Sequence, residues 1–185
     1  MFTNNFDPVA FNLFAFEIRW YSIAYIFGIL FGWFYCKRFL IRDKIISKLF
    51  DDLVTYLIIG IIVGGRLGYI LFYNLEYYFQ NFIEIFFIWE GGMSFHGGLI
   101  GIIIATFIFS KKHKINKYLF LDLISVSAPI GLFFGRVANF INGELIGKAT
   151  NGSWGVIFPQ IDSIPRHPSQ LYESFLEGIV LFIIM

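Results

Sequence analysis

The sequence predicts an all-α fold, a polytopic bundle of transmembrane helices, from its composition and from the spacing of its apolar segments. Of the 185 residues, 57% are hydrophobic and only 15% are charged, whereas a soluble domain carries about 25% charged residues. Apolar runs of ~20 residues, each long enough to cross a bilayer, recur along almost the whole length. The net charge of +1 gives no reason to expect nucleic-acid binding, and the single cysteine, Cys36, excludes an intrachain disulfide or a cysteine-based metal cluster.

Five apolar segments are predicted to span the membrane within a single transmembrane domain over residues 1–185. They cover about residues 19–39, 53–73, 93–109, 118–141 and 169–185. The amphipathic, aromatic stretch 76–90 is expected to lie at the interface. The last segment gives only ~24 Å of helix from Gln170 to Met185 against a hydrocarbon core ~30 Å thick, so we expect the chain to be truncated within this span.

The distribution of basic residues predicts the orientation of the chain in its membrane. The loops 37–48 and 111–117 are rich in Lys and Arg, whereas 74–92 has none and 142–168 has only two. Because short basic loops stay on the cytoplasmic side, the N-terminus and the 142–168 loop are predicted to be periplasmic. The N-terminal 17 residues contain no Lys or Arg, so they are not expected to be a secretory signal.

Polar side chains inside the predicted spans are the candidates for function, because burying them in a bilayer is costly. Arg66 lies in the second span, His96 at the outer end of the third, and Arg136 and Asn139 near the outer end of the fourth. Tyr21 lies at the outer end of the first span. The topology places all five at a similar depth, which predicts one polar site open to the outer leaflet. Since an arginine fork suits phosphate oxygens, this site favours a phospholipid substrate.

Structural roles remain open for several of these residues. Arg66 could bind a backbone carbonyl or pair with Glu76 or Glu90, and His96 could be a satisfied interfacial histidine. Tyr21 could belong to the aromatic belt that lines a membrane interface.

The polar residues at the end of the fourth span also have structural alternatives. Arg136 with Asn139 could cap the helix or brace a loop, and Glu144 could form a cap or pair with Lys148. At the level of function, a phospholipid-using membrane transferase and a non-enzymatic transporter or scaffold both stay open as alternatives. A transporter usually has internal repeats, and we find none in this sequence.

Five stretches of the chain resemble the prolipoprotein diacylglyceryl transferases. They are RWY at 19–21, GGRLGY at 64–69, FHGGLIG at 95–101, NFINGE at 139–144 and PRHPSQLYE at 165–173. The resemblance is collinear from about Phe6 to Met185. In that family, residues 142–168 would form a small periplasmic head segment. The family has further spans, with another essential arginine, a glutamate and a tyrosine that nothing here matches, so the resemblance also implies a truncated chain whose activity by itself stays open.

The resemblance implies a reaction and its partners. The family transfers the sn-1,2-diacylglyceryl group of phosphatidylglycerol to the lipobox cysteine in the signal peptide of a prolipoprotein. A thioether forms and glycerol 1-phosphate is released, as the first step of bacterial lipoprotein maturation. The family needs no metal and no organic cofactor, so we expect none, and the expected partners are phosphatidylglycerol, the prolipoprotein and membrane lipids.

The resemblance also implies roles for individual residues. The family's motifs place its histidine at His96, its tyrosine at Tyr21 and its phosphatidylglycerol-binding arginine at Arg136, and we expect these three to be catalytic. The expected substrate-binding residues are Arg66, Arg136, Asn139, Asn142, Glu144 and Gly147. An imidazole accepts a proton near neutral pH, so we expect His96 to take the proton of the cysteine thiol. The alternative is that His96 only donates a hydrogen bond that shapes the glycine-rich turn.

Overall fold

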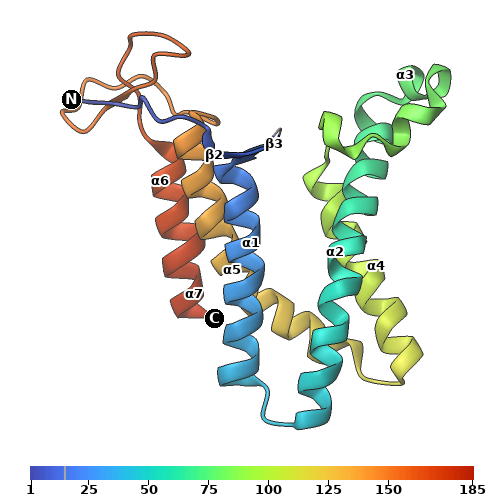
Figure 1. Cartoon of the computed structure of the whole chain (residues 1–185). Coiled ribbons are helices and arrows are strands. Elements are labelled where there is room, and N and C mark those ends of the chain that lie inside the picture. The colour runs from blue at the N-terminus through green and yellow to red at the C-terminus, as the bar shows by residue number, and fades with distance from the viewer. Residues whose placement is uncertain (15) are drawn as a thin grey trace. The chain divides into compact units, whose positions relative to one another are not determined.

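Helices make up most of the structure, a computed structural model that describes residues 1–14 and 16–185, without the side chains of Phe16 and Glu90 (Figure 1). The chain divides into two units, one formed by residues 1–40 and 124–185 and the other by residues 41–123. The predicted all-α membrane fold is confirmed, because four helices are long and apolar enough to cross a membrane: Trp20–Leu40, Lys44–Tyr73, Phe95–His113 and Lys117–Asn142. The expectation of a single transmembrane domain stays a prediction.

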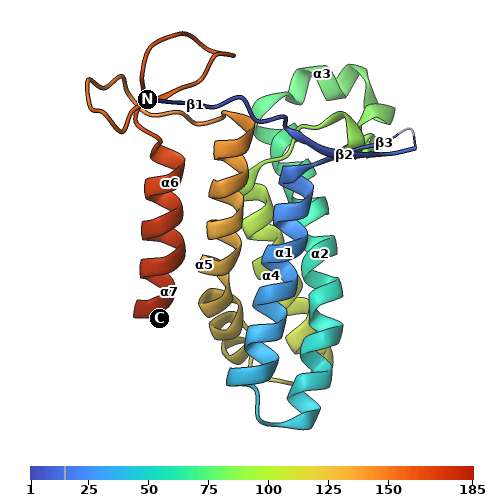
Figure 2. The same ribbon diagram turned by 60° about the vertical axis from the view of Figure 1, so that its left-hand side comes forward.

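The first unit contains three helical segments that lie side by side in both views (Figure 1, Figure 2). Helix α1 (Trp20–Tyr35) continues into the π-helical turn η1 (Cys36–Leu40), and the second segment is the part of α5 (Lys117–Asn142) from residue 124 onward. The third is a continuous helix formed by α6 (Ser169–Glu173), the π-helical η4 (Ser174–Val180) and α7 (Leu181–Ile184). This third helix occupies the position of the fifth predicted span.

Small residues let these helices approach closely. A Cβ added to Gly28 on α1 would lie 3.0 Å from the Cα of Gly131 on α5. A Cβ added to Gly178 on η4 would lie 2.7 Å from the Cβ of Phe133 on α5. The hydroxyl of Ser174 donates to the Phe133 carbonyl at 3.3 Å, which holds the third helix in register along α5.

Short strands, which the sequence analysis did not anticipate, order the N-terminus. Strand β2 (Val9–Leu13) pairs antiparallel with β3 (Phe16–Arg19). Strand β1 (Phe2–Thr3) pairs parallel with β4 (Val156–Ile157), in the segment that follows α5. Buried Asn4 completes this connection, because its side-chain amide donates to the Phe140 carbonyl at 2.6 Å. The N-terminus is thereby tied to the end of α5.

The second unit is built on two helices that pack along each other. Helix α2 (Lys44–Tyr73) is capped by the carboxylate of Asp43 and is followed by α3 (Leu75–Gln80) and the 3₁₀ turns η2 (Phe82–Phe86) and η3 (Ile88–Glu90). Helix α4 (Phe95–His113) then returns along α2. A Cβ added to Gly60 would lie 2.6 Å from the Gly101 carbonyl oxygen, so the two backbones are in direct contact. Such glycine-mediated contact is typical of membrane helices.

Candidate functional site

Arg136 is the centre of an ion-pair cluster in the first unit. It projects from the last two turns of α5, and its Nη1 lies 3.0 Å from the Glu173 carboxylate on α6. Its Nη2 and Nε lie 3.1 and 3.2 Å from one carboxylate oxygen of Glu177 on η4. The side chain of Arg136 is 26% exposed. A charged fork is therefore held between two carboxylates with about a quarter of its side chain exposed.

Glu144 is fixed by amides at the end of the same helix. Asn139 donates to one of its carboxylate oxygens at 3.1 Å, and Asn142 donates to the other at 3.2 Å. The backbone amide of Glu144 also donates to the Asn139 carbonyl, and its own carbonyl accepts from the Gln170 side chain. The alternative pairing with Lys148 is not among the contacts in the described part of the chain.

Two buried acceptors in this cluster have no hydrogen-bond partner among the described residues. They are Oδ1 of Asn142 and Oε1 of Gln170. Buried polar atoms in native proteins are nearly always paired, so an orphan acceptor calls for an explanation. A ligand that donates hydroxyl hydrogen bonds would satisfy them.

Gly147 lies where two segments of the head approach each other. Its amide donates to the His167 carbonyl at 3.1 Å, and an added Cβ would lie 2.9 Å from the His167 Cβ. The amide of His167 in turn donates to the Lys148 carbonyl at 2.9 Å. Close packing thus accounts for glycine at this position, while its expected substrate contact stays a prediction.

The head also contains an ion pair between Arg166 and Asp162. The guanidinium donates two hydrogen bonds to that carboxylate. This hydrogen bonding lowers the pKa of Asp162 below its ordinary value and raises the pKa of Arg166. The pair braces the head segment, with both side chains about a quarter exposed.

Tyr21 lies in the first turn of α1 and is half-buried. Its ring meets the edge of Tyr25 at 5.1 Å between centroids. It belongs to the same unit as Arg136, and its catalytic role stays a prediction.

Arg66, in the second unit, has contacts that support its structural alternative. The side chain is 4% exposed, and its guanidinium donates to the backbone carbonyls of Glu84, Ile85 and Gly91. It also stacks 5.1 Å from the ring centroid of Tyr78. Arg66 thus ties the non-spanning stretch after α2 to that helix, as a backbone-binding arginine would, and its expected contact with substrate stays a prediction.

His96 lies in the first turn of α4 and is exposed. The hydroxyl of Ser94 caps this turn by accepting from the Gly97 amide at 3.2 Å, so the glycine-rich turn is held without the imidazole. This observation weakens the idea that His96 shapes the turn. His96 and Arg66 belong to the second unit and the other expected residues to the first, so their convergence on one site stays a prediction.

The partners of Arg136 were not predicted from the sequence. Glu173 stood within a quoted motif but was given no role, and Glu177 lies one helical turn beyond it. The available signal was their spacing, because two acids four residues apart in an apolar segment share one helix face and need a cation. Within residues 1–14 and 16–185, no cluster of three or more His, Cys, Asp or Glu side chains could hold a metal ion.

Comparison with known proteins gives one consistent result. A model of the prolipoprotein diacylglyceryl transferase family matches residues 8–185. Three proteins named phosphatidylglycerol–prolipoprotein diacylglyceryl transferase are similar over nearly the whole chain. The one from Rickettsia bellii is 57% identical over 98% of this chain and 70% of its own length. The one from Rickettsia canadensis is 53% identical over 98% of this chain and 71% of its own length. The one from Rickettsia typhi is 54% identical over 100% of this chain and 72% of its own length. The chain belongs to the prolipoprotein diacylglyceryl transferase family.

Proposed function

We propose that this chain is a membrane transferase that moves a diacylglyceryl group from phosphatidylglycerol to a cysteine thiol of a prolipoprotein. The observation that carries this proposal is the 53–57% identity to transferases of that name over 98% of the chain. The Arg136 cluster supplies the cation that such a reaction needs. This step would begin lipoprotein maturation.

The chemistry is a displacement at a carbon that bears a phosphate. The thiol sulfur attacks the glyceryl carbon, a C–S bond forms, and the C–O bond to the phosphate breaks. The thiol proton goes to a base, for which we propose His96, and the electron pair leaves with glycerol 1-phosphate. A free thiol has a pKa of about 8.5, so a base helps to form the attacking thiolate near neutral pH.

Arg136 would bind the phosphate as it leaves. Negative charge grows on the phosphate oxygens during C–O cleavage, and a guanidinium already held in place stabilises it. Because the fork is paired with Glu173 and Glu177, the phosphate would take over contacts that these carboxylates hold. The two acids then orient the guanidinium between turnovers.

The amide cluster next to Arg136 would bind the glycerol headgroup. Asn139 and Asn142 are both held by Glu144, and the unpaired Oδ1 of Asn142 could accept a hydrogen bond from a glycerol hydroxyl. Substrate would thus meet a cation for its phosphate and acceptors for its hydroxyls. We propose that this site faces the outer leaflet of the bacterial inner membrane, with the N-terminus in the periplasm.

Transfer to a thiol is tested directly with a lipobox peptide. The full-length protein in phosphatidylglycerol vesicles should add the mass of one diacylglyceryl group to the peptide, and a peptide with serine in place of the cysteine should gain nothing. Addition of a single acyl chain, or equal modification of the serine peptide, would point to a different lipid transferase.

A further inference from the structure

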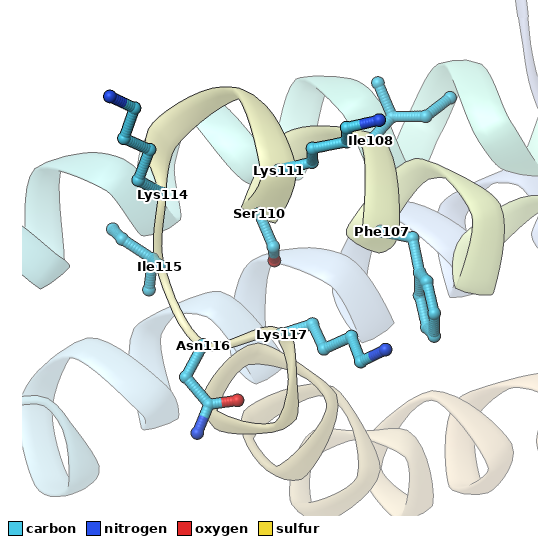
Figure 3. A pocket seen from close by; sticks show the side chains of 8 residues that line it. All are labelled: Phe107, Ile108, Ser110, Lys111, Lys114, Ile115, Asn116 and Lys117. Carbon is cyan, nitrogen blue, oxygen red and sulfur yellow. The ribbon is translucent and has the colours of Figure 1, made fainter.

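A concave site lies at the turn between α4 and α5, at the opposite end of α4 from His96. It is a cavity of about 560 Å³ within the second unit, and Lys111, Lys114 and Lys117 contribute to its wall. No acidic partner for these three ammonium groups exists among the residues that the structure describes. Three positive charges therefore surround the cavity, with the Lys114 ammonium turned away from the enclosed space in Figure 3.

A buried hydroxyl faces this cavity. Ser110 is 3% exposed, and its Oγ has no hydrogen-bond partner in the described part of the chain. Figure 3 shows this hydroxyl pointing into the space enclosed by the turn, with Lys117 across from it. The Ser110 carbonyl is satisfied, because it accepts from the Ile115 amide at 3.0 Å. An unpaired buried donor beside three lysines is suited to an oxygen-rich anion.

The rest of the lining is apolar. Phe107 and Ile115 contribute to the wall, and the ammonium of Lys117 lies 4.1 Å from the Phe107 ring centroid. A free inorganic anion gains nothing from such a surface, whereas the glycerol and first methylenes of a lipid would bury against it. A helix that crosses a membrane ends near the lipid headgroups, and the cavity lies at the end of α4, which is long and apolar enough to cross one.

We propose that this cavity binds the phosphate of an anionic phospholipid, with the Ser110 hydroxyl and the three lysines as its ligands. The site is separate from the proposed base, since Ser110 follows His96 by 14 positions along α4, which corresponds to ~21 Å. The bound lipid anchors the α4–α5 turn at the membrane surface and is not a substrate. The proposal does not depend on the transferase reaction.

Native mass spectrometry of the full-length protein, released from phosphatidylcholine nanodiscs doped with phosphatidic acid, tests this site. A neighbouring lysine contributes about fivefold to binding at an anionic surface, so Lys111→Gln/Lys114→Gln/Lys117→Gln should reduce retained phosphatidic acid on the order of 100-fold. The matched control, Arg42→Gln/Lys44→Gln/Lys48→Gln, removes the same charge elsewhere in the second unit. Equal retention by the cavity variant and the wild type, or equal loss in the control, would overturn the proposal.

Ser110→Ala separates a binding role from a structural one. A neutral hydrogen bond is worth about two- to tenfold in affinity, so phosphatidic acid retention should fall by that factor. Without anionic lipid, the thermal midpoint should stay the same or rise, because a buried unpaired hydroxyl is removed. Unchanged retention in Ser110→Ala would overturn the hydroxyl's role. Displacement of the lipid by 10 mM inorganic phosphate would identify a free-anion site and overturn the lipid assignment.

Discussion

Replacing Arg136 with lysine separates the shape of its side chain from its charge. The guanidinium makes three contacts with two carboxylates, through Nε and both terminal nitrogens, at 3.0–3.2 Å. A lysine ammonium is a point charge and cannot reproduce this planar fork. The same geometry would let the guanidinium bind two phosphate oxygens together, so Arg136→Lys should keep the charge and lose one of those bonds.

The expected magnitude follows from that lost bond. A hydrogen bond to a charged group contributes ~1.5–3 kcal/mol. Because Arg136 is 26% exposed, solvent screening favours the lower end of that range. Since 1.4 kcal/mol corresponds to a factor of ten, kcat/KM for diacylglyceryl transfer should fall about tenfold. Arg136→Gln also removes the charge, so its kcat/KM should fall on the order of 100-fold or more.

The assay measures thioether formation on a lipobox peptide in phosphatidylglycerol vesicles, over a range of lipid fractions. Arg166→Lys is the matched control, because it alters an arginine whose fork holds a carboxylate within the head segment. The control should change kcat/KM less than threefold. Arg136→Lys with more than half of the wild-type kcat/KM would refute the role of the fork in phosphate binding.

Three further predictions concern topology and stability. Ser153→Cys should react with a membrane-impermeant thiol reagent added from the periplasmic side and Lys112→Cys should not, and the reverse pattern would contradict the proposed orientation. Gly101→Ala should lower the thermal midpoint in detergent by several degrees, because its Cβ would meet the backbone of α2, whereas Gly131→Ala, with open space around it, should change little. Asp162→Asn should lower the midpoint modestly at pH 7. Because the pKa of Asp162 is lowered in the folded state, that difference should shrink as the pH falls below about 3.9, and a constant difference would exclude the ion pair as its cause.

Hydropathy predicted the apolar parts of the long helices well, but it did not predict the polar start of α2. The first, third and fourth predicted spans agree with helices in the structure to within a few residues. Helix α2 begins at Lys44, well before the expected residue 53. The prediction missed its first turns because they are charged and amphipathic. A hydropathy pattern detects the membrane-crossing part of a helix and does not detect a polar extension.

Contacts between segments far apart in the chain could not be predicted from the sequence. The contact of Phe2–Thr3 with Val156–Ile157 joins strands of two residues each, too short to give a periodic pattern. The bracing role of Arg66 was foreseen only as an alternative, because its carbonyl partners lie in irregular turns. By contrast, the resemblance named both Asn139 and Glu144 as substrate-binding residues, and in the structure their side chains are joined by a hydrogen bond.

Attack by a thiolate on the phosphate-bearing carbon is the central claim for this chain, and the pH dependence of His96→Gln tests it most directly. General-base catalysis contributes about 10²–10⁴ in rate, so transfer by His96→Gln in the full-length protein should be slower by at least 10² at pH 7. Raising the pH to 8.5 should restore activity about tenfold, because a peptide thiol with a pKa near 8.5 then ionises unaided. His113→Gln, at the other end of the same helix, should transfer like the wild type at both pH values. A His96→Gln enzyme that keeps most of its activity at pH 7, or whose defect does not change with pH, would contradict this mechanism.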